Sequence, residues 1–129
     1  MQRVSGRVDG RQPQPGFTQV SRQGGPGRRI SQLNGQIGWS HGKDTTLYPD
    51  RIAVRGVLDH TFPPTAATSS WHFSAVGDGH DNATWTTLLA ALQAAGHDGV
   101  VSIEHEDPSL AAEESIARSA RALAKALSL

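Results

Sequence analysis

Two side chains that could bind a metal or transfer a proton stand at the ends of short apolar runs. His41 ends a run that starts at Ile37, and Glu104 follows Val100–Ile103. If both runs are neighbouring parallel strands, both side chains lie at the edge where parallel α/β folds keep their sites. An imidazole and a carboxylate can share a divalent ion such as Mn²⁺, Mg²⁺, Co²⁺ or Zn²⁺. The alternative is a lone strand-end histidine and a solvated acid.

Several charged residues surround these two candidates. Lys43 follows His41 by two residues and lies on the same side if the strand continues, where it could hold a phosphate or polarise a carbonyl. A solvated surface cation is the alternative for Lys43. Asp44 could pair with Lys43 or cap the next turn. We expect Glu106 and Asp107 to serve the start of the last helix.

A glycine-rich turn, Gly77–His80, precedes the clearest helix of the sequence. It could present His80 or its backbone N–H groups to an anion, which makes His80 a candidate substrate contact. It lacks the Gly-Lys-Ser/Thr of a Walker-type phosphate loop. The sequence also has no Gly-x-Ser-x-Gly elbow, and it has no cysteine to act as a nucleophile.

The elements that would position these residues follow an alternating order. A strand over Ile37–His41 is followed by a long connection, 45–80, rich in proline and glycine. Asp81 or Asn82 can cap a helix that Gly96 ends. Its apolar stripe has helical spacing. The stripe consists of Trp85, Leu88, Leu89 and Leu92.

The second half of the pattern is a strand and a final helix. The β-branched run Val100–Ile103 predicts a strand that is buried on both faces. Asp107–Pro108 or Ser109 opens the last helix. We expect that helix to bury the residues Ile116, Ala120, Leu123 and Leu127. The resulting βαβα order predicts a parallel strand pair. We expect a further strand to pair with each outer edge of this pair.

Composition and charge divide the 129 residues into two parts. Residues 1–30 carry six arginines and one acid and read as a disordered basic tail, whereas 31–129 are acidic overall. The tail could contact nucleic acid, but we rank that function last because no nucleic-acid motif accompanies it. No apolar run approaches the length of a membrane span or a signal-peptide core, so we expect a cytoplasmic protein without membrane contact.

Four motifs in sequence order resemble one enzyme family. They lie at Ile37–Asp44, Gly56–Asp59, Gly77–Asp81 and Gly96–Pro108. Together they are similar to the C-terminal end of the sugar phosphate isomerase/epimerase family, which has the xylose isomerase-like TIM barrel. The resemblance covers residues 31–129. It implies an α/β fold comprising about the last two βα units of a (β/α)₈ barrel.

The resemblance also implies a chemistry. Members of the family bind a divalent metal through two glutamates, an aspartate and a histidine. His41 matches the histidine and Glu104 the last glutamate, which also acts as an acid/base at carbons next to the substrate carbonyl. The metal would polarise that carbonyl. Lys43 matches a motif lysine, for which the resemblance implies a weaker substrate contact. The substrate would be a sugar or a related polyol.

Two departures from the family pattern matter. A second histidine often stands two residues before the metal histidine, and Trp39 occupies that position here. The first glutamate and the aspartate should come from earlier strands, and a full barrel needs about 250 residues. We therefore expect a truncated isomerase/epimerase-like chain that is inactive alone. The alternatives are a non-catalytic remnant or a subunit that completes a barrel with a second copy or another chain.

Overall fold

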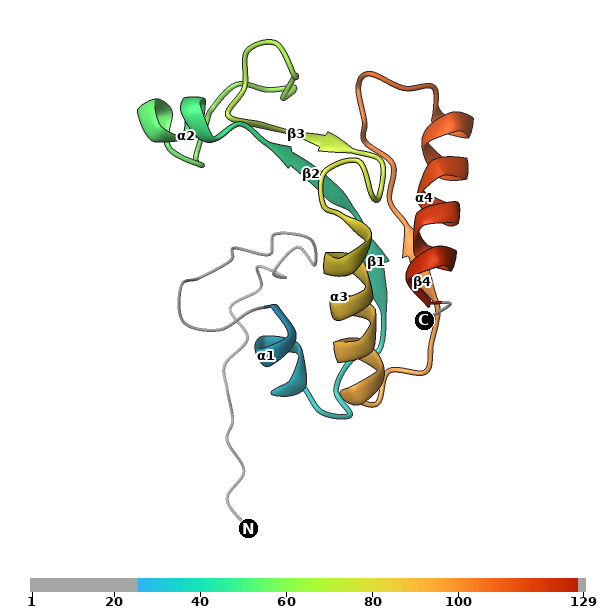
Figure 1. The fold of residues 1–129 in the computed structure, drawn as a ribbon. Helices are drawn as coiled ribbons and strands as arrows, with labels where there is room; N and C mark the ends of the chain where they lie inside the picture. Colours follow the sequence, from blue (N-terminus) through green and yellow to red (C-terminus); the bar gives the residue numbers. More distant parts are fainter. Residues whose placement is uncertain (1–25, 128–129) are drawn as a thin grey trace.

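The protein folds around a two-stranded parallel sheet that is covered by two helices. A computed structural model describes residues 26–127 (Figure 1). Its elements run in the order α1 (Pro26–Ser31), β1 (Ser40–Gly42), β2 (Asp44–Leu47), α2 (Pro49–Arg55), β3 (Trp71–Ser74), α3 (Asn82–Ala94), β4 (Val101–Ile103) and α4 (Ala112–Leu127). No described helix is both long enough and apolar enough to cross a membrane.

The predicted parallel strand pair is confirmed, although its first strand covers Ser40–Gly42 rather than Ile37–His41. β1 pairs with β4 in parallel, with His41 opposite Ser102 and Gly42 opposite Ile103. The connection between the two strands includes helix α3, and α4 follows the second strand, which retains the expected βαβα order. The pairing continues beyond β4, because the amide of Glu104 donates to the carbonyl of Gly42 at 3.1 Å. The mixed α/β class is therefore correct for the described residues.

The expected long connection at 45–80 is instead an arm with its own structure. β2 and β3 pair antiparallel, with Asp44 opposite Ser74 and Leu47 opposite Trp71. The arm comprises β2, α2 and β3, and it projects from the parallel pair with α2 at its far end (Figure 1). The β-branched and aromatic side chains of both strands suit a pleated ladder. Prolines and glycines scattered through the segment concealed this pattern in the sequence.

Helix α3 agrees closely with expectation. Asp81 is its N-cap and accepts from the Thr84 amide at 2.8 Å, and Gly96 follows the helix with a φ of 83°. Such a positive φ is accessible to glycine without steric cost. Trp85 and Leu89 of the predicted stripe are buried. Leu88 and Leu92 are partly buried against the same core, which also contains Val76, Leu123 and Ala126.

Helix α4 begins later and presents a different face than expected. It starts at Ala112 rather than at Asp107–Ser109. Its buried residues are Ser115, Ser119, Leu123 and Ala126, whereas Ile116, Ala120 and Leu127 are exposed. Of the four residues expected to be buried, Leu123 is confirmed and the other three are wrong, because α4 packs mainly through small side chains. An added Cβ on Gly42 would lie only 3.3 Å from Leu123 Cδ1, and the Ser119 hydroxyl accepts from the Val76 amide at 2.9 Å.

Two further expectations need correction. The strand residues Val101–Ile103 are half-buried rather than buried, because helices cover only one face of the described sheet. Of the predicted tail, residues 1–25 lie outside the described part of the chain. Residues 26–30 belong to α1, which lies beside α3 (Figure 1). The Gly35 amide, shortly after α1, donates to the Ala95 carbonyl at the end of α3 at 2.9 Å.

One buried carboxylate joins the arm to the helical layer. The Asp44 side chain is fully buried and accepts hydrogen bonds from six donors of 2.6–3.2 Å. The donors are the backbone amides of Thr45, Gly77, Gly79 and His80, the His80 ring nitrogen Nδ1 and the Trp85 indole nitrogen. Asp44 therefore fixes the start of β2 against the turn that precedes α3.

We predict that Asp44→Asn destabilises the fold strongly. The amide offers one acceptor oxygen instead of two, so several buried donors lose their partner. We expect the free energy of unfolding to fall by about 3 kcal/mol or more, measured by urea denaturation. Asp78→Asn is the matched control, because Asp78 is exposed and its carboxylate pairs with the equally exposed Arg118. The control should cost less than about 1 kcal/mol. Equal losses for the two variants would contradict this role of Asp44.

Candidate functional site

The face of the parallel sheet that the helices leave uncovered carries polar side chains. Successive residues of an extended strand point to opposite faces. Ser40, Gly42, Val101 and Ile103 lie on the side of the helices, where Val101 and Ile103 pack on the core. The alternate residues line the other face and contact one another across the strands. We call this set the polar ladder, and it consists of Trp39, His41, Lys43, Ser102, Glu104 and Glu106.

The outer end of the polar ladder is an ion cluster. The Lys43 ammonium lies 2.8 Å from Glu104 Oε1 and 3.0 Å from Glu106 Oε1. It also lies 4.0 Å from the centre of the Phe73 ring, so β3 covers it from the arm side. Only 11% of the Lys43 side chain is exposed. A cation that is enclosed by two carboxylates and an aromatic face is not a free anion-binding group.

The cluster keeps Glu104 ionised. The hydrogen bond from Lys43 holds the pKa of Glu104 below its ordinary value, against the opposing effect of partial burial. The positive charges of Lys43 and, to a smaller extent, His41 act in the same direction. Glu104 is about one third exposed, so its carboxylate is accessible as well as charged. These properties suit a metal ligand or a proton acceptor.

The inner end of the polar ladder contains the exposed His41. Its ring nitrogen Nδ1 lies 3.0 Å from the Ser102 hydroxyl, directly across the strand pair. Trp39 donates its indole N–H to the same hydroxyl at 3.2 Å. The rings of Trp39 and His41 are 6.2 Å apart. His41 is thus held by its neighbours at one nitrogen and accessible to solvent.

The structure brings three of the four predicted site residues to one face. His41, Lys43 and Glu104 all belong to the polar ladder, whereas His80 belongs to the Asp44 cluster. His80 donates its Nδ1–H to the buried carboxylate at 2.6 Å. This contact gives His80 a structural partner, and its proposed contact with substrate stays a prediction. Asp44 caps the turn at 77–80 instead of pairing with Lys43.

The described residues hold at most part of a metal site. No group of three or more histidine, cysteine, aspartate or glutamate side chains within 26–127 is placed to bind one ion. His41 and Glu104 offer one imidazole nitrogen and one carboxylate, which are donors that divalent metals accept. The donor set therefore fits such an ion chemically, but it is incomplete in number.

Three residues of the site were not predicted from the sequence. Glu106 was expected at the start of a helix, yet it pairs with Lys43, because the chain remains extended after β4. Ser102 and Phe73 were not among the predicted site residues. The i, i+2 spacing of Ser102, Glu104 and Glu106 could have predicted part of the site, since it places all three on one face of a strand. Asp107, by contrast, does form a local turn, accepting from the Ser109 amide at 2.8 Å.

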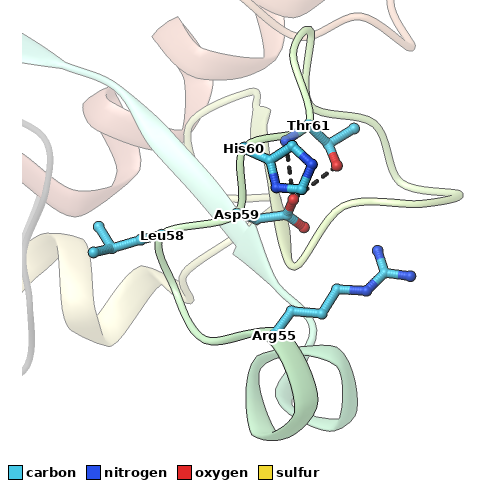
Figure 2. Close-up of a pocket in the computed structure, with 5 residues that line it drawn as sticks. All are labelled: Arg55, Leu58, Asp59, His60 and Thr61. Carbon is cyan, nitrogen blue, oxygen red and sulfur yellow. Dashed lines mark hydrogen bonds between the residues drawn. The ribbon is translucent and has the colours of Figure 1, made fainter.

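A separate hollow of about 460 Å³ lies on the arm (Figure 2). It is lined by Arg55, Leu58, Asp59, His60 and Thr61. The Asp59 carboxylate accepts from both the amide and the hydroxyl of Thr61 and from the Ser70 amide. These bonds, led by the Thr61 hydroxyl, hold the pKa of Asp59 far below its ordinary value. Asp59 thus stabilises its own loop, and the hollow adds no acid/base group to the polar ladder.

Comparison with known proteins gives one informative match. No protein-family model matches the chain, and no solved structure matches it. The chain is similar to a curated protein of Bacillus subtilis (strain 168) that is named uncharacterized protein YfiH, with 32% identity over 97 residues. The match covers 75% of this chain and 31% of the relative. The chain therefore corresponds to less than a third of that protein's length, and the relative's name states no activity.

We predict that Lys43→Met destabilises the protein in a pH-dependent way. Glu104 has a folded-state pKa below its unfolded value, so its ionised form stabilises the fold above the unfolded pKa. That contribution is lost as the pH falls through the folded pKa. The difference in unfolding free energy between wild type and Lys43→Met should therefore be largest at neutral pH and should narrow in acid.

Chemical denaturation at several pH values measures this difference. Lys125→Met is the control, because Lys125 lies exposed in the last turn of α4. Its effect on stability should be small and should not vary with pH in this way. A pH-independent cost for Lys43→Met would contradict the ion cluster.

Proposed function

We propose that this chain supplies the last two βα units of a xylose isomerase-like barrel and is a sugar phosphate isomerase/epimerase-like protein. The observation that carries the proposal is the polar ladder. It places His41 and Glu104 on one open face of two neighbouring parallel strands, near the carboxyl ends of those strands. Active sites of barrel enzymes lie at that end.

The polarity of the open face supports a site rather than a packing surface. A sheet face that only packs against other elements is usually apolar. Here it carries an ammonium group in contact with two carboxylates, and an imidazole in contact with a hydroxyl. The match to a much longer relative agrees with a larger barrel, because the relative has room for further strands.

The chain's own residues would have distinct roles. His41 and Glu104 would hold a divalent ion, Mn²⁺, Mg²⁺, Co²⁺ or Zn²⁺, together with ligands from elsewhere in a complete barrel. Such an ion supplies Lewis-acid polarisation of a carbonyl when bound. Glu104, kept ionised by Lys43, would accept a proton from a carbon next to that carbonyl and return it. The substrate class would be a sugar phosphate or a related polyol.

A second candidate function, a subunit of a shared barrel, is favoured by the incomplete set of metal-binding donors. Within residues 26–127 the parallel sheet has only two strands, so each has an outer edge without a strand neighbour. Val100, Ile116 and Leu127 are exposed on the adjoining elements. These features favour a subunit that completes a barrel with a second copy or another chain. In either case the chain by itself would lack isomerase activity.

We predict that the purified chain binds Mn²⁺ weakly and through the polar ladder. His41→Gln and Glu104→Gln should each remove most of the binding, because each deletes one of the two donors. His60→Gln is the control, since His60 is exposed and lines the hollow on the arm rather than the polar ladder. Water-proton relaxation during a titration with MnCl₂ detects such weak binding.

Two results would overturn the proposal. One is Mn²⁺ binding that His41→Gln and Glu104→Gln leave unchanged. The other is strong Mn²⁺-dependent epimerisation by the chain alone, because that would require a complete site within it. The second result is measured as deuterium uptake from heavy water at the carbon next to the carbonyl of a sugar phosphate.

A further inference from the structure

The Ser102 hydroxyl is the hydrogen-bonding centre of the inner polar ladder. Three groups lie within hydrogen-bond distance of its oxygen on this face. They are the Trp39 indole nitrogen at 3.2 Å, the Ser40 carbonyl oxygen at 3.2 Å and His41 Nδ1 at 3.0 Å. A serine hydroxyl has one hydrogen to donate and two lone pairs that accept. The three contacts therefore match its full capacity, and their roles can be assigned by elimination.

The assignment starts from the two groups whose roles are fixed. An indole N–H can only donate, so Trp39 uses one lone pair of Ser102. A carbonyl oxygen can only accept, so Ser40 takes the single hydroxyl hydrogen when all three contacts are hydrogen bonds. What remains on Ser102 is one lone pair, which faces His41 Nδ1. His41 fills this position only if its Nδ1 carries a hydrogen.

We infer that Ser102 sets the tautomer of His41, with the hydrogen on Nδ1 and the lone pair on Nε2. In water a neutral imidazole favours the opposite tautomer, so the protein must impose this one. The consequence of this tautomer rests on the proposed function: His41 would bind a metal ion through Nε2. Ser102 is then a positioning residue, as outer partners of metal-binding histidines generally are.

The environment of the other ring nitrogen agrees with this role. The His41 side chain is exposed, and within residues 26–127 no hydrogen bond to its Nε2 is formed. Glu104 lies two residues after Ser102, on the same face of the strand. The Nε2 nitrogen of His41 and the carboxylate of Glu104 therefore lie on the same face of the sheet. Trp39 strengthens the arrangement because it occupies the lone pair that would otherwise bind water.

NMR spectroscopy measures the tautomer of the His41 ring directly. Long-range ¹H–¹⁵N spectra of the metal-free chain, recorded at about pH 8.5 where histidines are ordinarily neutral, distinguish the protonated ring nitrogen from the unprotonated one. His41→Gln identifies the His41 signals among the six histidines. We expect Nδ1–H in the wild type, the Nε2–H form in Ser102→Ala, and Nδ1–H again in Ser102→Thr, which restores the hydroxyl.

His97 provides an internal control in the same spectra. Its Nε2 lies 3.1 Å from the Ser40 hydroxyl, on the other face of the strand, so its signals should not respond to changes at Ser102. An Nε2–H tautomer in the wild type would overturn the inference, and this reading does not depend on any variant folding. An Nδ1–H tautomer that persists in Ser102→Ala would overturn it as well.

A second readout links the tautomer to the proposed metal site. Ser102→Ala should weaken Mn²⁺ binding by about tenfold, and Ser102→Thr should restore it. If the tautomer follows Ser102 but no variant affects Mn²⁺ binding, the positioning role in a metal site is wrong. If the tautomer does not follow Ser102 while His41→Gln still abolishes Mn²⁺ binding, the proposed function stands and this inference fails.

Discussion

The buried carboxylate of Asp44 is the constraint on which the rest of the structure depends. It is enclosed within the fold, and it stays there because six donors converge on it from β2, the turn at 77–80 and Trp85 of α3. A buried charge with fewer partners would be costly. By fixing the chain at residue 44, the carboxylate also fixes the direction of the preceding residue. Lys43 consequently points to the opposite face, where it reaches Glu104 and Glu106.

The two faces of the small parallel sheet have different chemistry because strand residues alternate. One face packs on α3 and α4 through Val101, Ile103 and the close approach of Leu123 to Gly42. The other carries the polar ladder, in which each charged or polar group contacts a neighbour across the strands. Lys43 neutralises the acids at one end, and Ser102 binds His41 at the other. One face of the sheet is therefore a packing surface, and the other holds the polar and charged groups of this chain's candidate site.

Local patterns in the sequence predicted some elements well and others poorly. The Asp81 cap, the stripe of α3 and the strand at Val101–Ile103 were predictable because each depends on neighbouring residues. The α4 face was not, because the sequence does not show that Ser115 and Ser119 would be buried while Ile116 would be exposed. The arm was missed because β2 and β3 are separated by the irregular segment 56–70. His41 and Glu104 were predicted as neighbours from strand ends alone, but the roles of Ser102 and Glu106 depend on strand register.

We propose that one open sheet face gathers the donors with which this chain would bind a metal ion. The most direct test is paramagnetic broadening of the amide signals of the ¹⁵N-labelled chain by small amounts of Mn²⁺. The structure predicts that broadening begins at residues 40–42 and 102–106, which face each other across β1 and β4. Broadening centred on His60 of the arm, or on His80 and Asp81 at the start of α3, would contradict the claim.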